Sequence, residues 1–543
     1  AGDIRKSTAG TSNFAAGVNA GNSIESGGNY NVAVGDEAGT AITTGDYNTV
    51  LGYVAGDAIT TGGENTFLGY NSGGLNVSGN YNTFLGSGAG SATTGSDSTG
   101  VGRNAMTANT TGINVAVGYR ALDANTTGTS NVALGVDALG ANVAGDQSVA
   151  VGHEALIVQN PSGNVDMDNV AVGYRALYAN TTGTQNNAIG SGALDANTTA
   201  SYNTAMGHNA LGANTTGAGN TAVGQTALTA TTTGSNNIGI GAGAGAAITT
   251  ANNNTMVGYV AGDATTTGAQ NTALGSSALG GNTTASNNVA IGYNTLTLNT
   301  TATQNTAIGA YAGDAITTSP SNTLMGFAAG SEITTGTGEN VCIGNYAGWK
   351  MTTGAQNVFI GDNAGSQAVL TGTSNIAIGD NAGLSLTSGA SNCVLGAAAG
   401  DAITTGSGNV AIGQNALGAQ TTPSNNIAIG NNAGQVNDTG DGFVVIGYRS
   451  GAALTAGSTQ NTFVGYEAGA SVTTGDYNTL VGGGAGDAQT TASNSTFVGF
   501  AAGGLVTTGE SNTLLGSHAG DAVTTGANNI AVGMNSLTSN TTA

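Results

Sequence analysis

The chain has 543 residues, of which 95 are glycine, 7 % are charged and 5 % are aromatic. Its 7 basic residues are outnumbered by 29 acidic ones, and the resulting formal charge of −22 argues against nucleic acid or an anionic membrane as a partner. No apolar run approaches the roughly 18 residues of a membrane span, and 3 histidines with so little charge give acid–base catalysis little material. We therefore expect no membrane span, no enzyme and no cofactor.

Residues 1–10 form a short N-terminal extension before the patterned part of the chain. The chain starts with Ala1 and shows no signal peptide, so we expect a processed or partial chain. The extension is too short for a folded lid. Arg5 and Lys6, two of the 7 basic residues, are expected to pair with acidic coils of a neighbouring subunit.

From residue 11 to residue 543 one phrase ending in glycine recurs, as in Asn31–Gly35 (NVAVG) and Asn305–Gly309 (NTAIG). We call its last residue the phase glycine. It occurs 31 times from Gly17 to Gly533, and 23 of the 30 spacings are 17 residues. This period is too short for a helical-pair repeat of about 33 residues, and each internal glycine would weaken a helix by up to about 1 kcal/mol. The sequence predicts an all-β parallel solenoid, or β-roll, of about 31 coils in one continuous rod.

Each coil is expected to hold two short strands, one over Asn-Thr-Ala-Ile and one around Ala-x-Thr-Thr, with glycine and asparagine at the corners. Pro161, Pro320 and Pro423 all lie between the Thr-Thr region and the next Asn. A corner there can lack a backbone donor, so the prolines are compatible with this path.

Stacked coils place equal positions of the repeat in columns about 4.8 Å apart. We number the columns from the phase glycine. Column −1 is aliphatic in every copy, and column −4 is Asn in 27 copies, which predicts a ladder of amide hydrogen bonds. Column +4 is either Gly or Leu/Met. Where it is Leu or Met, column +7 is polar, and where it is Gly, column +7 is usually apolar and column −2 can be bulky. Such compensation of side-chain volume is expected for groups that share one close-packed space.

These columns predict two apolar seams, one constant and one exchanging. A thin coil has room for one interior, so the second seam would be an exposed patch that lateral association of identical chains could bury. The alternative is that both seams lie inside a wider coil.

The longest spacing, 21 residues, separates Gly152 from Gly173. It makes the coil at 153–172 irregular and predicts a bulge, which serves either recognition or no function.

Five sets of residues are candidates for chemistry. The histidines fall in distant coils, and Cys342 and Cys393 are three coils apart, so we expect surface histidines and buried free thiols without a metal or catalytic site. An aspartate column at +5 is expected on the solvated surface, and a tyrosine column at +1 either packs at the corner or contacts a carbohydrate or protein ligand. The Asn-Thr-Thr sequons are candidates for N-glycosylation. The members are His153, His208 and His518; Asp57, Asp123, Asp195, Asp263, Asp314, Asp401, Asp487 and Asp521; Tyr53, Tyr70, Tyr119, Tyr174, Tyr259, Tyr293, Tyr448 and Tyr466; and Asn109, Asn125, Asn180, Asn197, Asn214, Asn282, Asn299 and Asn540.

The chain ends within a repeat, at Thr541-Thr542-Ala543, and no capping element is evident at either end. Open terminal coils expose unpaired backbone. We therefore expect either a piece of a longer fibre or subunits that stack head to tail.

Asn287–Gly292 (NNVAIG), with Asn409–Gly413 and Asn426–Gly430, resembles the head repeats of YadA-like trimeric autotransporter adhesins. Similar Gly/Ala/Thr repeats occur in phage fibre proteins. The resemblance implies a left-handed parallel β-roll, a side-by-side homotrimer and attachment to host molecules. The family's head coil is shorter, so the second half of this coil should follow its own path, and no heptad stalk or membrane anchor is present.

Together these features predict an extracellular or cell-surface structural fibre subunit, non-catalytic and self-associating. An adhesin head that binds host-cell or matrix components and a phage tail-fibre shaft are the alternatives, and a solenoid hydrolase is the remote one.

Overall fold

The computed structural model describes residues 4–5, 10–422, 424–436, 440–455 and 457–542. These residues form strands, turns and bends, and the described ranges contain no helix. The chain divides into two units, Ala1–Gln270 and Asn271–Ala543, and each by itself is a parallel β-solenoid with one short strand per coil. The predicted fold class is thus confirmed. A single rod from residue 11 to residue 543 stays a prediction.

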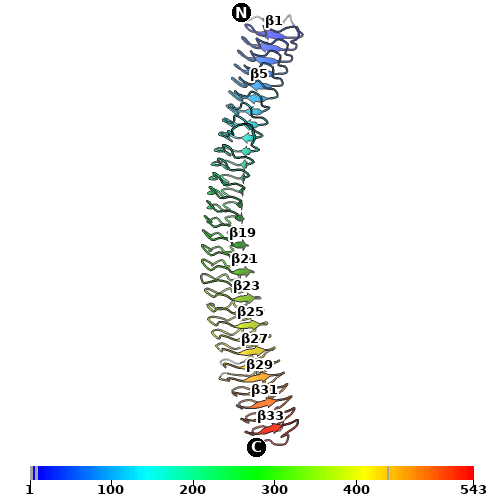
Figure 1. The fold of residues 1–543 in the computed structure, drawn as a ribbon, viewed down its shortest axis with the longest axis vertical. Helices are drawn as coiled ribbons and strands as arrows, with labels where there is room; N and C mark the ends of the chain where they lie inside the picture. Colours follow the sequence, from blue (N-terminus) through cyan, green and yellow to red (C-terminus); the bar gives the residue numbers. More distant parts are fainter. Residues whose placement is uncertain (1–3, 6–9, 423, 437–439, 456, 543) are drawn as a thin grey trace. The chain divides into compact units, whose positions relative to one another are not determined.

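In the first unit, the three-residue strands stack in register in one parallel ladder (Figure 1). Each strand lies directly before its phase glycine, so equal columns face each other, as Phe67 faces Phe84. The strands of this ladder are β2 (Phe14–Ala16), β3 (Val32–Val34), β4 (Thr49–Leu51), β5 (Thr66–Leu68), β6 (Thr83–Leu85), β7 (Thr99–Val101), β8 (Val115–Val117), β9 (Val132–Leu134), β11 (Val149–Val151), β13 (Val170–Val172), β14 (Asn187–Ile189), β15 (Thr204–Met206), β16 (Thr221–Val223), β17 (Ile238–Ile240) and β18 (Thr255–Val257).

The second unit repeats this arrangement with the same register, as in Ile343 facing Ile360. Its strands are β19 (Thr272–Leu274), β20 (Val289–Ile291), β21 (Thr306–Ile308), β22 (Thr323–Met325), β23 (Val341–Ile343), β24 (Val358–Ile360), β25 (Ile376–Ile378), β26 (Cys393–Leu395), β27 (Val410–Ile412), β28 (Ile427–Ile429), β29 (Val444–Ile446), β30 (Thr462–Val464), β31 (Thr479–Val481), β32 (Thr496–Val498), β33 (Thr513–Leu515) and β34 (Ile530–Val532).

The rest of each coil is a chain of turns, so the second predicted strand, around Ala-x-Thr-Thr, was wrong. In the turn before this stretch, residues at +2 and +4 have positive φ, for example Val54 at 50° and Leu122 at 54°. The Ala-x-Thr-Thr stretch itself consists of turn and bend residues. Backbone hydrogen bonds still join these turns from coil to coil, as from Thr43 N to Thr60 O at 3.0 Å. Pro161 and Pro320 lie in this turn region as predicted, and Pro423 lies outside the described residues.

The phase glycine is required by both conformation and space. Gly69 has φ of 135°, and a Cβ atom built there would lie 2.5 Å from the carbonyl oxygen of Gly86 in the next coil. Only glycine adopts this backbone freely, and only glycine lets the two coils approach this closely.

The exchanging seam forms the core of the solenoid. A Cβ added to Gly56 would lie 2.7 Å from Cδ1 of Ile59 and 3.0 Å from Cδ2 of Phe67, so these side chains fill the space that Leu occupies in other coils. Column +4 has positive φ in both kinds of coil. This explains why its large members are Leu or Met and never β-branched, because branching at Cβ makes the left-handed region most costly.

The Asn column at −4 forms the predicted ladder and is buried. Asn65 donates from Nδ2 to Oδ1 of Asn48 at 3.0 Å, and Asn48 does the same to Asn31 at 3.1 Å. Each amide also closes its own coil, as in the bond from Asn48 Nδ2 to Gly62 O at 2.8 Å. A second ladder, at +7, joins Asn180, Asn197 and Asn214 in the coils with Leu at +4.

The insertion at 153–172 is anchored to the coils before it. Its segment β12 (Val165–Asp166) pairs in parallel with β10 (Gly145–Asp146), and Met167 is fully buried. Asn164 Oδ1 accepts a hydrogen bond from the Thr127 hydroxyl at 2.8 Å. Residues 162–166 are exposed, so the predicted bulge is present, and the contacts above hold it against the preceding coils.

The expectation of no cap at the N-terminal end needs correction. β1 (Ile4–Arg5) pairs antiparallel with β2, so the edge of the first ladder strand that faces away from β3 is covered. An antiparallel partner from the extension satisfies backbone groups that an open edge would expose. The predicted pairing of Arg5 and Lys6 with a neighbouring subunit stays a prediction, and Lys6 and Ala543 lie outside the described residues.

Candidate functional surface

The outward face of the strand ladder carries the constant seam. In β5, Thr66 is exposed, Phe67 is fully buried and Leu68 is 41 % exposed, because successive strand residues point to opposite sides. The same alternation recurs along both ladders. Columns −1 and −3 therefore form one outer face, which we call the strand face; column −1 is apolar throughout, and column −3 alternates between Thr and apolar residues, with Asn187 as the exception. The hypothesis that both seams lie inside a wider coil was wrong.

The strand face is large for a single chain. Fully burying an aliphatic side chain contributes about 1.5–3 kcal/mol at about 25 cal/mol per Å², which corresponds to about 60–120 Å². Column −1 members such as Leu395, 42 % exposed, thus present about 25–50 Å² each. Most of the 16 members of this column in the second unit are less exposed than Leu395, so about 400–800 Å² is an upper limit for the area that this column presents. This limit is comparable to the largest patch of about 300–600 Å² on a typical monomer.

The tyrosines at +1 project outward rather than packing at the corner. All eight are exposed, from 40 % at Tyr119 to 64 % at Tyr259. Neighbouring members stack face to face, as Tyr448 and Tyr466 do at 5.2 Å between ring centroids. The structure therefore favours the hypothesis that these rings are available to a ligand.

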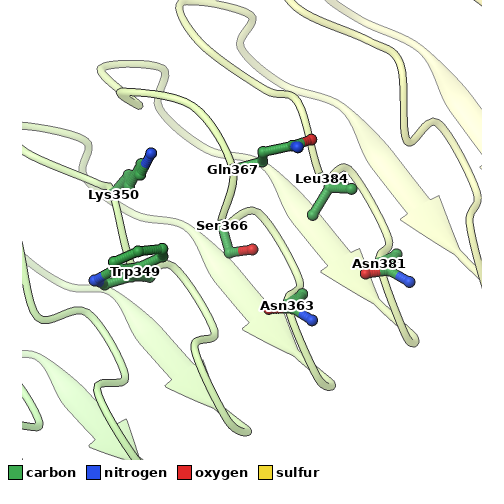
Figure 2. A pocket seen from close by; sticks show the side chains of 7 residues that line it. All are labelled: Trp349, Lys350, Asn363, Ser366, Gln367, Asn381 and Leu384. Carbon is green, nitrogen blue, oxygen red and sulfur yellow. The ribbon is translucent and has the colours of Figure 1, made fainter.

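A hollow in the second unit lies beside Trp349, the single tryptophan of the chain. Its volume is about 260 Å³, and three consecutive coils line it. Figure 2 shows Trp349 and Lys350 on one side, Leu384 and Asn381 on the opposite side, and Ser366 between them. The sequence analysis missed this hollow; the signals were the 18-residue spacing from Gly361 to Gly379 and the isolated Trp-Lys pair.

Another hollow, of about 230 Å³, lies a few coils further along the second unit. Asp401, Asn415 and Gln435 line it together with glycine and aliphatic residues, and no aromatic ring contributes to it.

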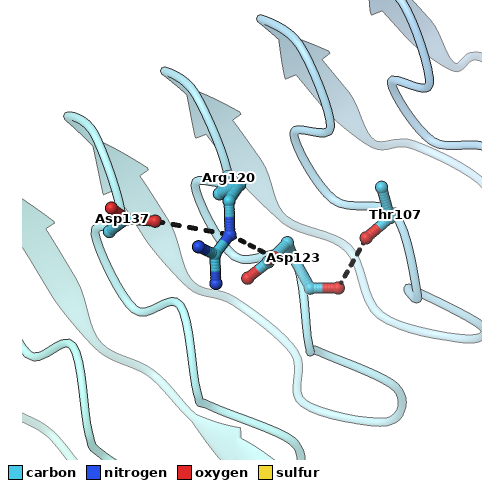
Figure 3. A network of polar contacts seen from close by, with 4 residues as sticks. All are labelled: Thr107, Arg120, Asp123 and Asp137. Atoms are coloured by element: carbon cyan, nitrogen blue, oxygen red, sulfur yellow. Dashed lines mark hydrogen bonds and ion pairs between the residues drawn. The ribbon is translucent and has the colours of Figure 1, made fainter.

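Arginine side chains bind acidic residues of column +5 and its neighbours. Arg120 Nε lies 3.1 Å from Asp123 Oδ2 and 3.5 Å from Asp137 Oδ1, and Thr107 donates to the Asp123 carbonyl oxygen at 2.9 Å (Figure 3). Arg120 therefore bridges two adjacent coils through opposite charges. Such exposed ion pairs contribute roughly 0–1 kcal/mol each, so they add little to the stability of the fold.

The aspartates at +5 are less solvated than predicted. Partial burial raises the pKa of several of these carboxyls above the ordinary value, and backbone hydrogen bonds lower it by less. The affected members are Asp57, Asp195, Asp263, Asp314, Asp401 and Asp487.

Histidines and cysteines stay apart, as their spacing implies. His153 stacks on Tyr174 and His518 lies edge-on to Phe500, while His208 is exposed in a third coil. Throughout the described ranges, no three His, Cys, Asp or Glu side chains come together as a metal group would require.

The two thiols differ in their surroundings. Cys342 points inward from column −2, and its burial raises its pKa to about 12. Cys393 lies at −3 on the strand face and is only half-buried, so the prediction that both thiols are buried was wrong for it.

The N-glycosylation sequons begin at side chains that the fold encloses. Seven of the eight asparagines are fully buried and lie in column +7. Their amides are therefore closed to modification in the folded coil, which contradicts the prediction of glycans at these seven positions. Asn540 is half-buried. The buried members are Asn109, Asn125, Asn180, Asn197, Asn214, Asn282 and Asn299.

Over the described residues, no helix has the length and apolar character needed to cross a membrane.

In the comparisons with known proteins, no family model matches the chain, and no curated protein matches it.

Proposed function

We propose that this protein is a non-catalytic structural subunit of an extracellular fibre and that its chains associate side by side through the strand face. The observation that supports this most strongly is the strand face itself, where each coil presents a half-exposed aliphatic residue at −1. A parallel sheet that leaves one apolar face uncovered is rare, because such sheets are normally covered on both faces.

The energetics favour association. Burial of column −1 of one unit, at most about 400–800 Å² per chain, contributes at most about 10–20 kcal/mol at about 25 cal/mol per Å². Association costs an estimated 4–15 kcal/mol in lost freedom. The balance is therefore favourable when the contact extends over many coils, and a rigid repeating surface supplies many coils without additional ordering cost.

Lateral contact is better supported than head-to-tail stacking. β1 already pairs antiparallel with the edge of β2, so a subunit that stacked on this end would not meet the parallel ladder edge directly. The resemblance of NNVAIG (287–292) to YadA-like head repeats supports a threefold side-by-side arrangement, in a fibre on a cell surface or a virion.

The test places charge on the strand face. In one variant Leu395 and Ile412, both at −1, are changed to Lys; in the matched control Ala397 and Gln414, exposed residues at +1 of the same coils, are changed to Lys. Sedimentation velocity across a concentration series measures the oligomeric state, and negative-stain imaging shows the particles.

We expect the unmodified chain to form an oligomer, with three chains as the expected number. The Leu395/Ile412 variant should dissociate at a concentration at least about tenfold higher, equivalent to about 1.4 kcal/mol, while the control stays near the unmodified chain. A monomer at tens of micromolar, or equal behaviour of the two variants, would refute lateral assembly through this face.

A further inference from the structure

The second unit carries an uninterrupted row of aromatic rings that leads to the hollow at Trp349. Tyr293, Tyr311, Phe327 and Tyr346 come from four successive coils, with ring centroids 5.5, 5.9 and 5.3 Å apart and planes turned by 80–86°. Tyr346 then lies 5.1 Å from Trp349. The other ring contacts in the described part of the chain join only two rings.

The rings are accessible along this row. Tyr293 is 50 % exposed and Phe327 is 44 % exposed, while the other rings are half-buried. One ring per coil gives a spacing close to the rise of about 4.8 Å between stacked strands. That spacing is similar to the length of one sugar residue in an extended glycan, so consecutive units can contact consecutive rings.

The hollow opens because one coil departs from the regular turn. In regular coils the residue at +6 donates to the carbonyl at +5 of the next coil, as Glu332 N donates to Trp349 O at 3.0 Å. Between the coil of Lys350 and the coil that follows it, the backbone bond runs instead from Leu370 N to Lys350 O, at 3.1 Å. Ser366, at +5 of this following coil, is buried. The extra residue before Gly379 permits this path. Toward the following coil the regular bond is kept, from Gln367 N to Leu384 O at 2.9 Å, so the turn of this coil departs from the Trp349 coil only.

The lining has the composition of a sugar site. The indole of Trp349 and the side chain of Leu384 give apolar surface for the C–H face of a pyranose ring, and Asn363, Gln367 and Asn381 give amide donors and acceptors for its hydroxyls. Concave sites with apolar walls and a few convergent polar groups are typical of small-ligand binding.

Lys350 is the only basic residue between Arg175 and Arg449, and its Nζ lies 5.2 Å from the Trp349 ring centroid. Arg120, Arg175 and Arg449 bind carboxylates, but within the described ranges no carboxylate pairs with Lys350, so its ammonium can donate to a ligand.

The surrounding charge is negative. Asp362 and Asp380 directly precede Asn363 and Asn381 on the rim, and the whole chain carries −22. An anionic sugar would gain one ammonium but approach two carboxylates, whereas an uncharged sugar uses the same donors without this repulsion.

We propose that the hollow, together with the aromatic row, binds a neutral saccharide chain, with one sugar ring on Trp349 and further units over Tyr346 and Phe327. This function is additional to the structural role and does not depend on lateral assembly. The second unit is then both a structural segment and a glycan-binding surface.

Because Trp349 is the single tryptophan, its fluorescence reports directly on the site. The full chain is titrated with cellohexaose, maltohexaose and chitohexaose as neutral probes, and with oligogalacturonate and a hyaluronan hexasaccharide as acidic probes. We expect a saturable change of tryptophan emission with at least one neutral hexasaccharide and a weaker change with the acidic ones.

Variants locate the binding, measured by calorimetry where the tryptophan is removed. Trp349→Ala should weaken binding by at least about tenfold, the scale expected for losing one aromatic stacking contact. Gln367→Ala, at an exposed position that leaves the fold intact, should weaken it several-fold. Tyr202→Ala removes a ring that is 66 % exposed in the first unit and should leave affinity unchanged.

Three outcomes would overturn the proposal. The first is the absence of a saturable change with every neutral hexasaccharide at millimolar concentration. The second is equal affinity of Trp349→Ala and the Tyr202→Ala control. The third is tighter binding of the acidic probes, which would exclude a neutral ligand. A tryptophan signal that instead followed protein concentration alone would assign the hollow to a second copy of the chain.

Discussion

The buried Asn ladder allows one interaction of the fold to be tested quantitatively, and Asn48 is a suitable position. Its side chain donates to Asn31 Oδ1 and to Gly62 O, and its Oδ1 accepts from the backbone N and from Nδ2 of Asn65 at 3.2 and 3.0 Å. Asn48→Ala removes all four bonds and leaves two buried backbone groups, Gly62 C=O and Asn65 N–H, without a partner. Each orphaned group costs about 1–3 kcal/mol, so the coil should lose about 2–6 kcal/mol.

Asn48→Ser is the informative comparison, because the chain already uses serine in this column. Ser98 donates from Oγ to Gly112 O at 2.8 Å, which reproduces the bond of Asn48 to Gly62. Ser495 Oγ accepts from Asn512 N at 3.3 Å. Serine can therefore satisfy both backbone groups, and Asn48→Ser should cost less than half as much as Asn48→Ala.

The assay must be local, since a repeat array does not unfold as one two-state unit. Hydrogen exchange read by mass spectrometry on peptides spanning residues 60–70 reports the opening free energy of this coil. Thr49→Ala, at an outward strand position, is the control. The reasoning fails if Asn48→Ala loses no more protection than Thr49→Ala, or if Ser and Ala at position 48 behave alike.

Three further predictions concern single columns. Leu122→Val places a β-branched residue at φ of 54° and should cost about 1–3 kcal/mol, whereas Leu122→Met should cost little. Hydrogen exchange on peptides around residue 122 compares the opening free energies of the two variants. Asp401→Asn should raise the melting temperature at pH 7 but not near pH 3. Burial raises the pKa of the Asp401 carboxyl, so the native state binds the proton more tightly than the unfolded state does and loses stability as the pH rises through this pKa. Burial raises the pKa of Cys342 to about 12, so this thiol should resist iodoacetamide in the native chain at pH 8 while Cys393 reacts, as mass spectrometry can show. Because the thiol ionises first in the unfolded chain, the stability of the native chain should fall from about pH 9 upward, which melting curves at pH 8 and pH 10 test.

Features that every coil shares were predictable from sequence alone. The strand register, the Asn ladder and the volume exchange all follow from stacking equivalent positions of the repeat, because a mismatch in one column would recur in every coil. Phe67 facing Phe84 and Asn65 bonding Asn48 are direct results of the period.

Features that depend on backbone conformation or on a single coil were not predictable in this way. The Ala-x-Thr-Thr stretch has a strand-like composition, yet it forms bends that follow a turn with positive φ at residues such as Val54 and Leu122. The hollow at Trp349 depends on where one extra residue is absorbed, and a count of spacings does not show which turn absorbs it. Burial of Asn125 likewise outweighs the surface preference that a sequon suggests.

The volume exchange is a property of neighbouring coils rather than of one coil. A Cβ added to Gly313 would lie 2.6 Å from Leu324 of the next coil and 3.0 Å from Leu296 of the preceding one. The space above a glycine at +4 is therefore filled from both sides, and a coil with Leu at +4 reaches into its glycine-type neighbour. Changing one coil from the Gly/Ile type to the Leu/Asn type should then disturb the coils above and below, and its cost should depend on their type. For this reason the repeat tolerates both types, but the type of each coil is coupled to the type of its neighbours, and column −1 on the strand face does not take part in the exchange.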